Sequence, residues 1–141
     1  MNDKLQVWLA KYLAEVGAVA GTVHLHENGG LRLAGAVNIP EKVQQAVVWV
    51  PSGKGMAGLA LQRGEPVSTC NLQDDNSRDV RPGAKAVDAR AAVAFPVRNG
   101  GGVIVAVVGA AFADERVFSE DELERLQAVA AHLANLSVAS P

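Results

Sequence analysis

Two pairs of strand-like segments, each joined by a glycine-containing turn, constrain the fold of this chain more than any other feature. Residues 21–27 and 31–37 alternate around an Asn-Gly-Gly turn, and residues 91–98 and 103–112 flank an Asn-Gly-Gly-Gly turn. Alternation of period two is typical of strands, and such turns join antiparallel neighbours. The sequence therefore predicts two β-hairpins in an antiparallel sheet.

Both ends of the chain have the apolar spacing of amphipathic helices. Residues 5–16 place their apolar side chains on one helical face, and Gly17 supplies a stop. Near the other end, Ser119 and Glu122 form a capping box, in which each side chain satisfies a free backbone amide at the helix start. Residues 123–137 continue as one apolar face. The sequence thus predicts a helix at each end.

Shorter elements are predicted between the hairpins. Residues 40–46 and 56–63 have the pattern of short helices, and residues 47–50 and 66–70 that of short strands. A polar stretch follows at residues 71–90. A connection of this length inside a compact domain is usually either functional or disordered. The order of elements indicates an α+β fold.

The stretch GKGMAG is a literal G-x-G-x-x-G, the spacing of dinucleotide-binding loops. That function requires a helix long enough to cross back over a parallel sheet. Here Gly64 and Pro66 end the helix after barely two turns, and the later strands form a hairpin. We therefore predict an architectural role. Gly53 and Gly55 allow positive φ in a turn, and Gly58 lets the short helix approach the sheet closely.

Composition excludes several classes of function. The net charge is −2 and the basic residues are scattered singly, which argues against a nucleic-acid-binding surface. Cys70 is the only cysteine, so no internal disulfide can form, and a reducing, cytoplasmic setting is expected. The longest apolar run, residues 103–113, is too short to cross a membrane, and charges interrupt the N-terminal segment where a signal peptide would be apolar. The 141 residues suit one domain, residues 1–141.

Three stretches together resemble the GAF domain family. VPSGKGMAGLALQRGEPVSTCNL is similar to the centre of a GAF domain, AAVAFPVRNGGGVIVAVVGAAF to its penultimate hairpin, and FSEDEL to the entry of its last helix. The resemblance covers residues 3–136. It implies a PAS/GAF (profilin-like) antiparallel sheet, with the terminal helices on one face and short helices plus the long loop over a small-molecule pocket on the other. It also implies a regulatory sensor that forms a homodimer through its terminal helices.

Candidate ligand-binding residues come from three places. In the long loop, Arg81 or Arg90 could grip an anionic ligand by a bidentate contact, whereas the alternative is a solvated loop with weak ion pairs. A tryptophan at the mouth of the glycine turn either walls the pocket or fills the core. The strand at 91–98 carries large side chains on one face and small ones on the other. The candidate set is Trp49, Asn71, Asp75, Arg81, Arg90, Ala92 and Phe95.

Metal and catalytic sites find little support. His24 and His26 lie on one side of the first predicted strand with Thr22, at a metal-ligand spacing. No carboxylate or cysteine is placed to join them, so the pattern favours partly buried hydrogen-bonding residues and no metal site. The sequence shows no Ser/His/Asp order with a nucleophile turn and no carboxylate pair tied to a cleft, and Cys70 has no histidine near it in sequence to lower its pKa. We therefore predict that the protein is not an enzyme.

The chemistry of specialised GAF subfamilies is only partly matched. Free methionine sulfoxide reductases of this type use several cysteines, one just before the penultimate hairpin, where this chain has residues 89–92 in the order Ala-Arg-Ala-Ala. Bilin-binding members carry Cys-His in the long loop, and none is present. Of the cyclic-nucleotide set, Asn71, Asp74 and Asp75 give a fragment. We predict a small-molecule sensor of unknown ligand and cofactor that signals to a separate protein. A reductase, a cyclic-nucleotide sensor and a ligand-free interaction module stay as alternatives.

Overall fold

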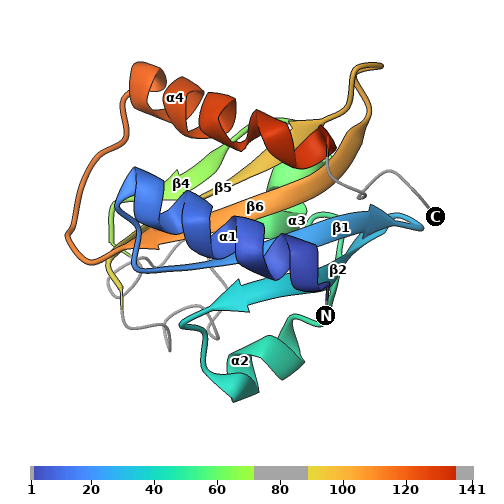
Figure 1. The fold of residues 1–141 in the computed structure, drawn as a ribbon, viewed down its shortest axis with the longest axis horizontal. Coiled ribbons are helices and arrows are strands. Elements are labelled where there is room, and N and C mark those ends of the chain that lie inside the picture. Colours follow the sequence, from blue (N-terminus) through green and yellow to red (C-terminus); the bar gives the residue numbers. More distant parts are fainter. Residues whose placement is uncertain (1, 72–88, 136–141) are drawn as a thin grey trace.

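The computed structural model describes residues 2–71 and 89–135 (Figure 1). The described residues form a six-stranded sheet in the order β3-β2-β1-β6-β5-β4, in which every neighbouring pair is antiparallel. The predicted antiparallel sheet with two hairpins is confirmed. Its strands are β1 (Ala20–Glu27), β2 (Gly30–Val37), β3 (Trp49–Pro51), β4 (Val67–Thr69), β5 (Ala91–Arg98) and β6 (Ile104–Phe112).

The helices divide between the two faces of the sheet as predicted. In Figure 1 the helices α1 and α4 lie side by side in front of the sheet, and α3 lies behind it. The short helix α2 lies beside the sheet, at the bottom of that view. The bounds are α1 (Asp3–Val16), α2 (Glu41–Ala46), α3 (Gly55–Arg63) and α4 (Glu120–Ala130), followed by a 3₁₀ turn, Ala131–Asn135.

The last helix departs from its predicted extent. The apolar periodicity predicts one helix over residues 123–137, whereas the α-helix ends at Ala130 and tightens into the 3₁₀ turn. Such tightening is common at helix ends, because i→i+3 bonds satisfy the last carbonyl groups. Ser137 lies outside the described residues.

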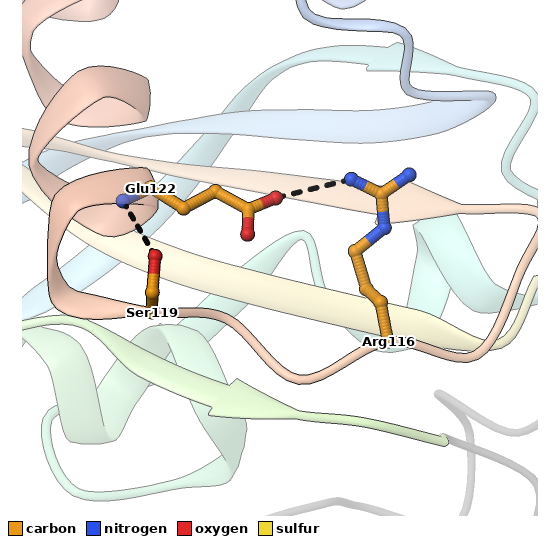
Figure 2. Close-up of polar contacts among 3 residues, drawn as sticks. All are labelled: Arg116, Ser119 and Glu122. Atoms are coloured by element: carbon orange, nitrogen blue, oxygen red, sulfur yellow. Dashed lines mark hydrogen bonds and ion pairs between the residues drawn. The ribbon is translucent and has the colours of Figure 1, made fainter.

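The N-termini of α1 and α4 are both capped, and the cap of α4 differs in part from the predicted capping box. Asn2 accepts a hydrogen bond from the Leu5 amide (3.1 Å), and the Ser119 hydroxyl accepts one from the Glu122 amide (3.1 Å; Figure 2). A complete capping box would return the Glu122 carboxylate to the Ser119 amide. In the structure that carboxylate accepts a bond from Nη1 of Arg116 instead (3.1 Å). The N-terminus of α4 is therefore tied to the loop before it.

The glycine motif is architectural, as predicted. Gly53 and Gly55 have φ of 87° and 65°. A Cβ atom at Gly58 would lie 2.5 Å from the carbonyl oxygen of Pro51, the last residue of β3. The turn also closes on itself, because the Gly53 amide donates to the Gly58 carbonyl (2.8 Å). Only glycine allows this close approach of α3 to the sheet.

The main core lies between the sheet and the two terminal helices. It contains large buried side chains from β5 and β6, among them Phe95 and Phe112, packed against Leu9 and Tyr12 of α1 and Leu126 of α4. A second core lies between the sheet and α3. Within the part of the chain that the structure describes, no helix has the length and apolar character needed to span a membrane.

Candidate functional site

The α3 face of the sheet carries a patch of small side chains at its centre. Along β1, Ala20 and Thr22 stand opposite Ala111 and Gly109 of β6, and Ala111 in turn stands opposite Ala92 of β5. Directly opposite residues of antiparallel strands share a face of the sheet. We call these five residues the small-residue floor. Their side chains are smaller than those on the other face of the sheet, and Ile39, Met56 and Ala89 pack on the alanines among them.

The described ends of the long connection meet this floor. Thr69, the last residue of β4, stands opposite Ala92. On the other side of the connection, Ala89 is buried in one cluster with Ala92 and the alanines of the floor, which Ile39 and Met56 also contact. The predicted lid, residues 71–90, lies mostly outside the described residues, as do Asp74, Asp75 and Arg81. Of this stretch the structure describes Asn71, Ala89 and Arg90, and Ala89 lies at the floor.

His24 follows Thr22 on the same face of β1, at the border between the floor and the α3 core. Its side chain is 2% exposed, and its Nε2 lies 2.9 Å from the carbonyl oxygen of Val47. A carbonyl oxygen only accepts, so the neutral ring carries its proton on Nε2. Its Nδ1 is then a buried acceptor, and none of the residues that the structure describes forms a hydrogen bond with it. Burial lowers the pKa of His24, although the Val47 bond acts in the opposite direction, so the ring is neutral at pH 7.

The second histidine of the strand does not join the first in a metal site. Nδ1 of His26 lies 2.9 Å from the carbonyl oxygen of Ile104, and this hydrogen bond is exposed to solvent. Among residues 2–71 and 89–135, no three His, Cys, Asp or Glu side chains are grouped so that they could hold a metal ion. The two histidines therefore act as hydrogen-bonding residues at two different points along the strand.

The structure places the five described candidate residues in different surroundings. Ala92 lies on the floor, and Asn71 lies just beyond β4, where its side-chain amide donates to Oε2 of Glu115 (2.7 Å). Arg90 precedes β5 with an exposed side chain. Phe95 is fully buried in the main core, on the face opposite the floor. The structure therefore brings Ala92 and Asn71 to the same region and places Phe95 away from them.

Trp49 also lies away from the floor. Its neighbour Val50 packs into the α3 core, so alternation along β3 turns Trp49 to the opposite face. The indole is 40% exposed, and the guanidinium carbon of Arg32 lies 5.8 Å from the ring centroid. A Cβ at Gly30 would clash with the indole, so this glycine makes room for the ring. Trp49 thus covers the edge of the sheet.

His24 is the residue of this region that the predicted set omits. The sequence could have indicated this, because His24 follows Thr22 by two residues on an alternating strand, and residues two apart lie on the same face. Its tautomer and its unpartnered Nδ1 depend on Val47, which is 23 residues away in sequence. No local pattern predicts that contact.

A separate hollow of about 400 Å³ lies on the helix face, between the C-terminal part of α1 and α4. Arg116 spans its wall, with the guanidinium carbon 4.3 Å from the Phe112 ring centroid and Nη1 bonded to Glu122. None of the five described candidate residues lines it. The lining residues are Glu15, Val16, Phe112, Arg116, Glu122, Arg125, Leu126 and Val129.

The sequence matches the model of one known family. The family model of the GAF domain matches residues 8–136. The chain belongs to the GAF domain family. GAF domains are in general regulatory and sensing domains, and the same fold also occurs in reductases. No curated protein matches the sequence.

Solved structures with the same fold include both kinds of protein. The type II free methionine-R-sulfoxide reductase of Thermoplasma acidophilum has a TM-score of 0.74 at 18% identity, over 96% of this chain and 90% of its own. The GAF domain of a phosphoenolpyruvate-protein phosphotransferase from Coxiella burnetii has a TM-score of 0.74 at 20% identity, over 93% and 78%. The GAF domain of a sensor histidine kinase from Bacillus halodurans has a TM-score of 0.71 at 17% identity, over 94% and 90%. At these identities the likeness shows the fold.

Proposed function

We propose that this GAF domain is a non-catalytic regulatory module that binds a small-molecule ligand on the α3 face of its sheet. The observation that carries the proposal is the small-residue floor beside the buried, unpartnered Nδ1 of His24. Small side chains leave room for a ligand, and a buried acceptor without a donor is rare in proteins. Ala92 belongs to the floor, and Asn71, Asp75, Arg81 and Arg90 are proposed to join it in contacting the ligand.

The direct test is mass spectrometry of the natively purified protein, which detects small molecules that co-purify. Ala92→Leu fills the floor, and Ala113→Leu adds the same side chain at an exposed position after β6. We expect the wild type and Ala113→Leu to retain a ligand that Ala92→Leu loses. If Ala92→Leu does not fold, Gly109→Ala replaces it as the test variant. Its added methyl group lies on the floor, 3.0 Å from Oγ1 of Thr22. A protein without any bound molecule, or equal retention by all variants, contradicts the proposal.

The proposed module acts as a homodimer through α1 and α4 and passes its signal to a separate protein. Two observations support this arrangement. Val7 of α1 is 55% exposed, and apolar side chains, including Phe112 and Val129, form part of the lining of the hollow between α1 and α4. Sedimentation equilibrium should give a dimer mass that Val7→Glu reduces to the monomer. A monomer mass that is independent of concentration contradicts the dimer.

A reductase is the second candidate function, because several structures of the same fold are free methionine-R-sulfoxide reductases. Cys70 is the only cysteine of the sequence and is exposed after β4, so a second thiol within the chain cannot resolve an oxidised intermediate. We therefore expect no thiol-dependent turnover of free methionine-R-sulfoxide. Turnover that is lost in Cys70→Ser would establish the reductase instead.

Two non-catalytic alternatives are separated by simpler measurements. Calorimetric titration with cAMP and with cGMP tests the cyclic-nucleotide sensor, for which Asn71 is the one described residue of the resembling set. We expect no heat of binding from either nucleotide. A ligand-free interaction module would show no co-purifying molecule and no change in thermal stability with any small molecule tested.

A further inference from the structure

His24 offers a single, well-defined hydrogen-bonding atom on the α3 face. The Val47 carbonyl fixes the proton on Nε2, so Nδ1 presents a lone pair and nothing else. The residues directly opposite His24 on the neighbouring strands, Leu33 and Val107, have no polar side-chain group. The neighbouring strands therefore place no donor opposite His24, and Nδ1 has no hydrogen-bond partner among residues 2–71 and 89–135.

The side chains around Nδ1 of His24 determine whether a charged or an uncharged donor suits it. The floor residues Ala20, Thr22, Ala92, Gly109 and Ala111 are all uncharged, as are Leu33 and Val107. A charged donor placed there would lose its hydration and would gain no counter-ion from these residues. An amide N–H, a hydroxyl or a heteroaromatic N–H loses much less. The site therefore favours a neutral donor over an ammonium or guanidinium group.

We infer that the ligand of the proposed site docks an uncharged hydrogen-bond donor on Nδ1 of His24, with its adjoining part over the small-residue floor. This inference rests on the proposed function, because it names the class of group that the same site selects. The hydroxyl of Thr22, two residues earlier on the same face, supplies a second hydrogen-bonding group. The proposed ligand thus contacts Nδ1 of His24, which only accepts a hydrogen bond, the neighbouring Thr22 hydroxyl and the side chains of the small-residue floor.

Access to Nδ1 requires a movement, because the His24 side chain is 2% exposed. We expect the side chain of Met56 of α3 to make this movement. It packs against the alanines of the floor and also against the cluster that contains Val107, the residue opposite His24. A methionine side chain is unbranched and adapts its conformation at low cost. It can give way to a ligand while the backbone of α3 stays in place.

Two variants of His24 separate the roles of its nitrogens. The amide nitrogen of glutamine takes the place of Nε2, so His24→Gln keeps the donor to Val47 and loses the acceptor at Nδ1. Asparagine places its amide oxygen near Nδ1, so His24→Asn keeps the acceptor and loses the Val47 bond. Ligand recognition should therefore survive better in His24→Asn, and fold stability better in His24→Gln.

The experiment measures ¹⁵N resonances of the histidine rings while small probes are added to the full chain. The probes are three matched pairs: indole with 1-methylindole, phenol with anisole, and acetanilide with N-methylacetanilide. In each pair methylation removes the donor and adds one methyl group. We expect the donor member to move the Nδ1 resonance of His24 and to bind about tenfold more tightly, the equivalent of one hydrogen bond. His24→Gln should abolish that difference, and His24→Asn should retain it.

The outcomes separate this inference from the proposed function. If a co-purifying ligand is lost in Ala92→Leu while Nδ1 of His24 is unaffected by it, the site stands and the donor assignment is wrong. Equal binding of both members of each pair, no binding of any probe, or a water that stays on Nδ1 in the ligand complex also overturns the inference. Absence of any ligand at the floor overturns both.

Discussion

The hydroxyl of Tyr12 in α1 donates a hydrogen bond to the main-chain carbonyl oxygen of Leu126 in α4, at 2.9 Å. The two residues are 114 positions apart, so this bond fastens the first helix to the last. The ring also stacks on Trp8 with centroids 5.0 Å apart and meets Phe95 edge-on at 6.2 Å. Tyr12 is therefore a central contact of the helix face.

Replacing Tyr12 with phenylalanine removes this bond and keeps the ring packing. We expect Tyr12→Phe to lower the free energy of unfolding by about 0.5–1.5 kcal/mol, the usual net contribution of one such bond. Urea denaturation measures the change, and an unchanged m-value would show that the fold is retained. A variant as stable as the wild type would mean that the Leu126 carbonyl is fully satisfied within α4.

Tyr12 should also make the protein sensitive to alkali. Burial raises the pKa of Tyr12, and the carboxylate of Glu15 raises it further. The unfolded chain ionises this group first, near pH 10, so stability is complete below that pH and falls as the pH rises above it. Tyr12→Phe should lose this component of the alkaline decline. Parallel decline of both proteins between pH 9 and 11 (roughly one unit on either side of the ordinary tyrosine pKa) would contradict the assignment.

Ser119 and Glu122 should contribute unequally to the start of α4. Ser119→Ala removes the cap on the Glu122 amide, and we expect a loss of about 1 kcal/mol in unfolding free energy. Glu122→Gln weakens only the ion pair with Arg116, whose two side chains are 30% and 37% exposed, so a loss well below about 1 kcal/mol is expected. Thermal denaturation of the two variants at equal pH compares them. A larger effect of Glu122→Gln would reverse this order.

The elements that the sequence predicts well are those set by neighbours in the chain. The hairpins follow from alternation and Asn-Gly turns, and the cap at Ser119 follows from the three residues after it. The two faces of β5 were also predictable, because Ala92 and Phe95 fall on opposite sides of an alternating strand.

The position of the site depends on contacts between distant segments, which local patterns do not encode. Phe95 belongs to the predicted site but packs on Tyr12, because the terminal helices cover its side of β5. Trp49 lies beside the glycine turn in sequence, yet its strand turns it away from α3. The acceptor at His24 exists only because the Val47 carbonyl lies next to Nε2.

Gly58 should be intolerant of even a methyl group. Alanine is the better helix former, by about 1 kcal/mol, so an exposed site would gain stability. At Gly58 the added Cβ would lie 2.5 Å from the Pro51 carbonyl oxygen, which is backbone and cannot rotate away. We expect Gly58→Ala to destabilise the protein by about 1–3 kcal/mol. Gly100→Ala, where nothing lies within 4 Å of the new Cβ, is the control and should be nearly neutral.

His24 should make stability depend on pH in the weakly acidic range. Burial lowers the pKa of His24 from the ordinary value of 6.5, while the Val47 bond partly offsets this. Above that pH both folded and unfolded chains hold a neutral ring, so the group has no effect. As the pH falls below about 6.5, the unfolded chain takes up a proton that the folded chain resists, and stability declines. His24→Gln keeps the donor to Val47 and cannot titrate, so its unfolding free energy should stay flatter between about pH 6.5 and 5. Identical curves for the two proteins over this range would show that the folded chain accommodates the protonated ring, and that Nδ1 has found an acceptor.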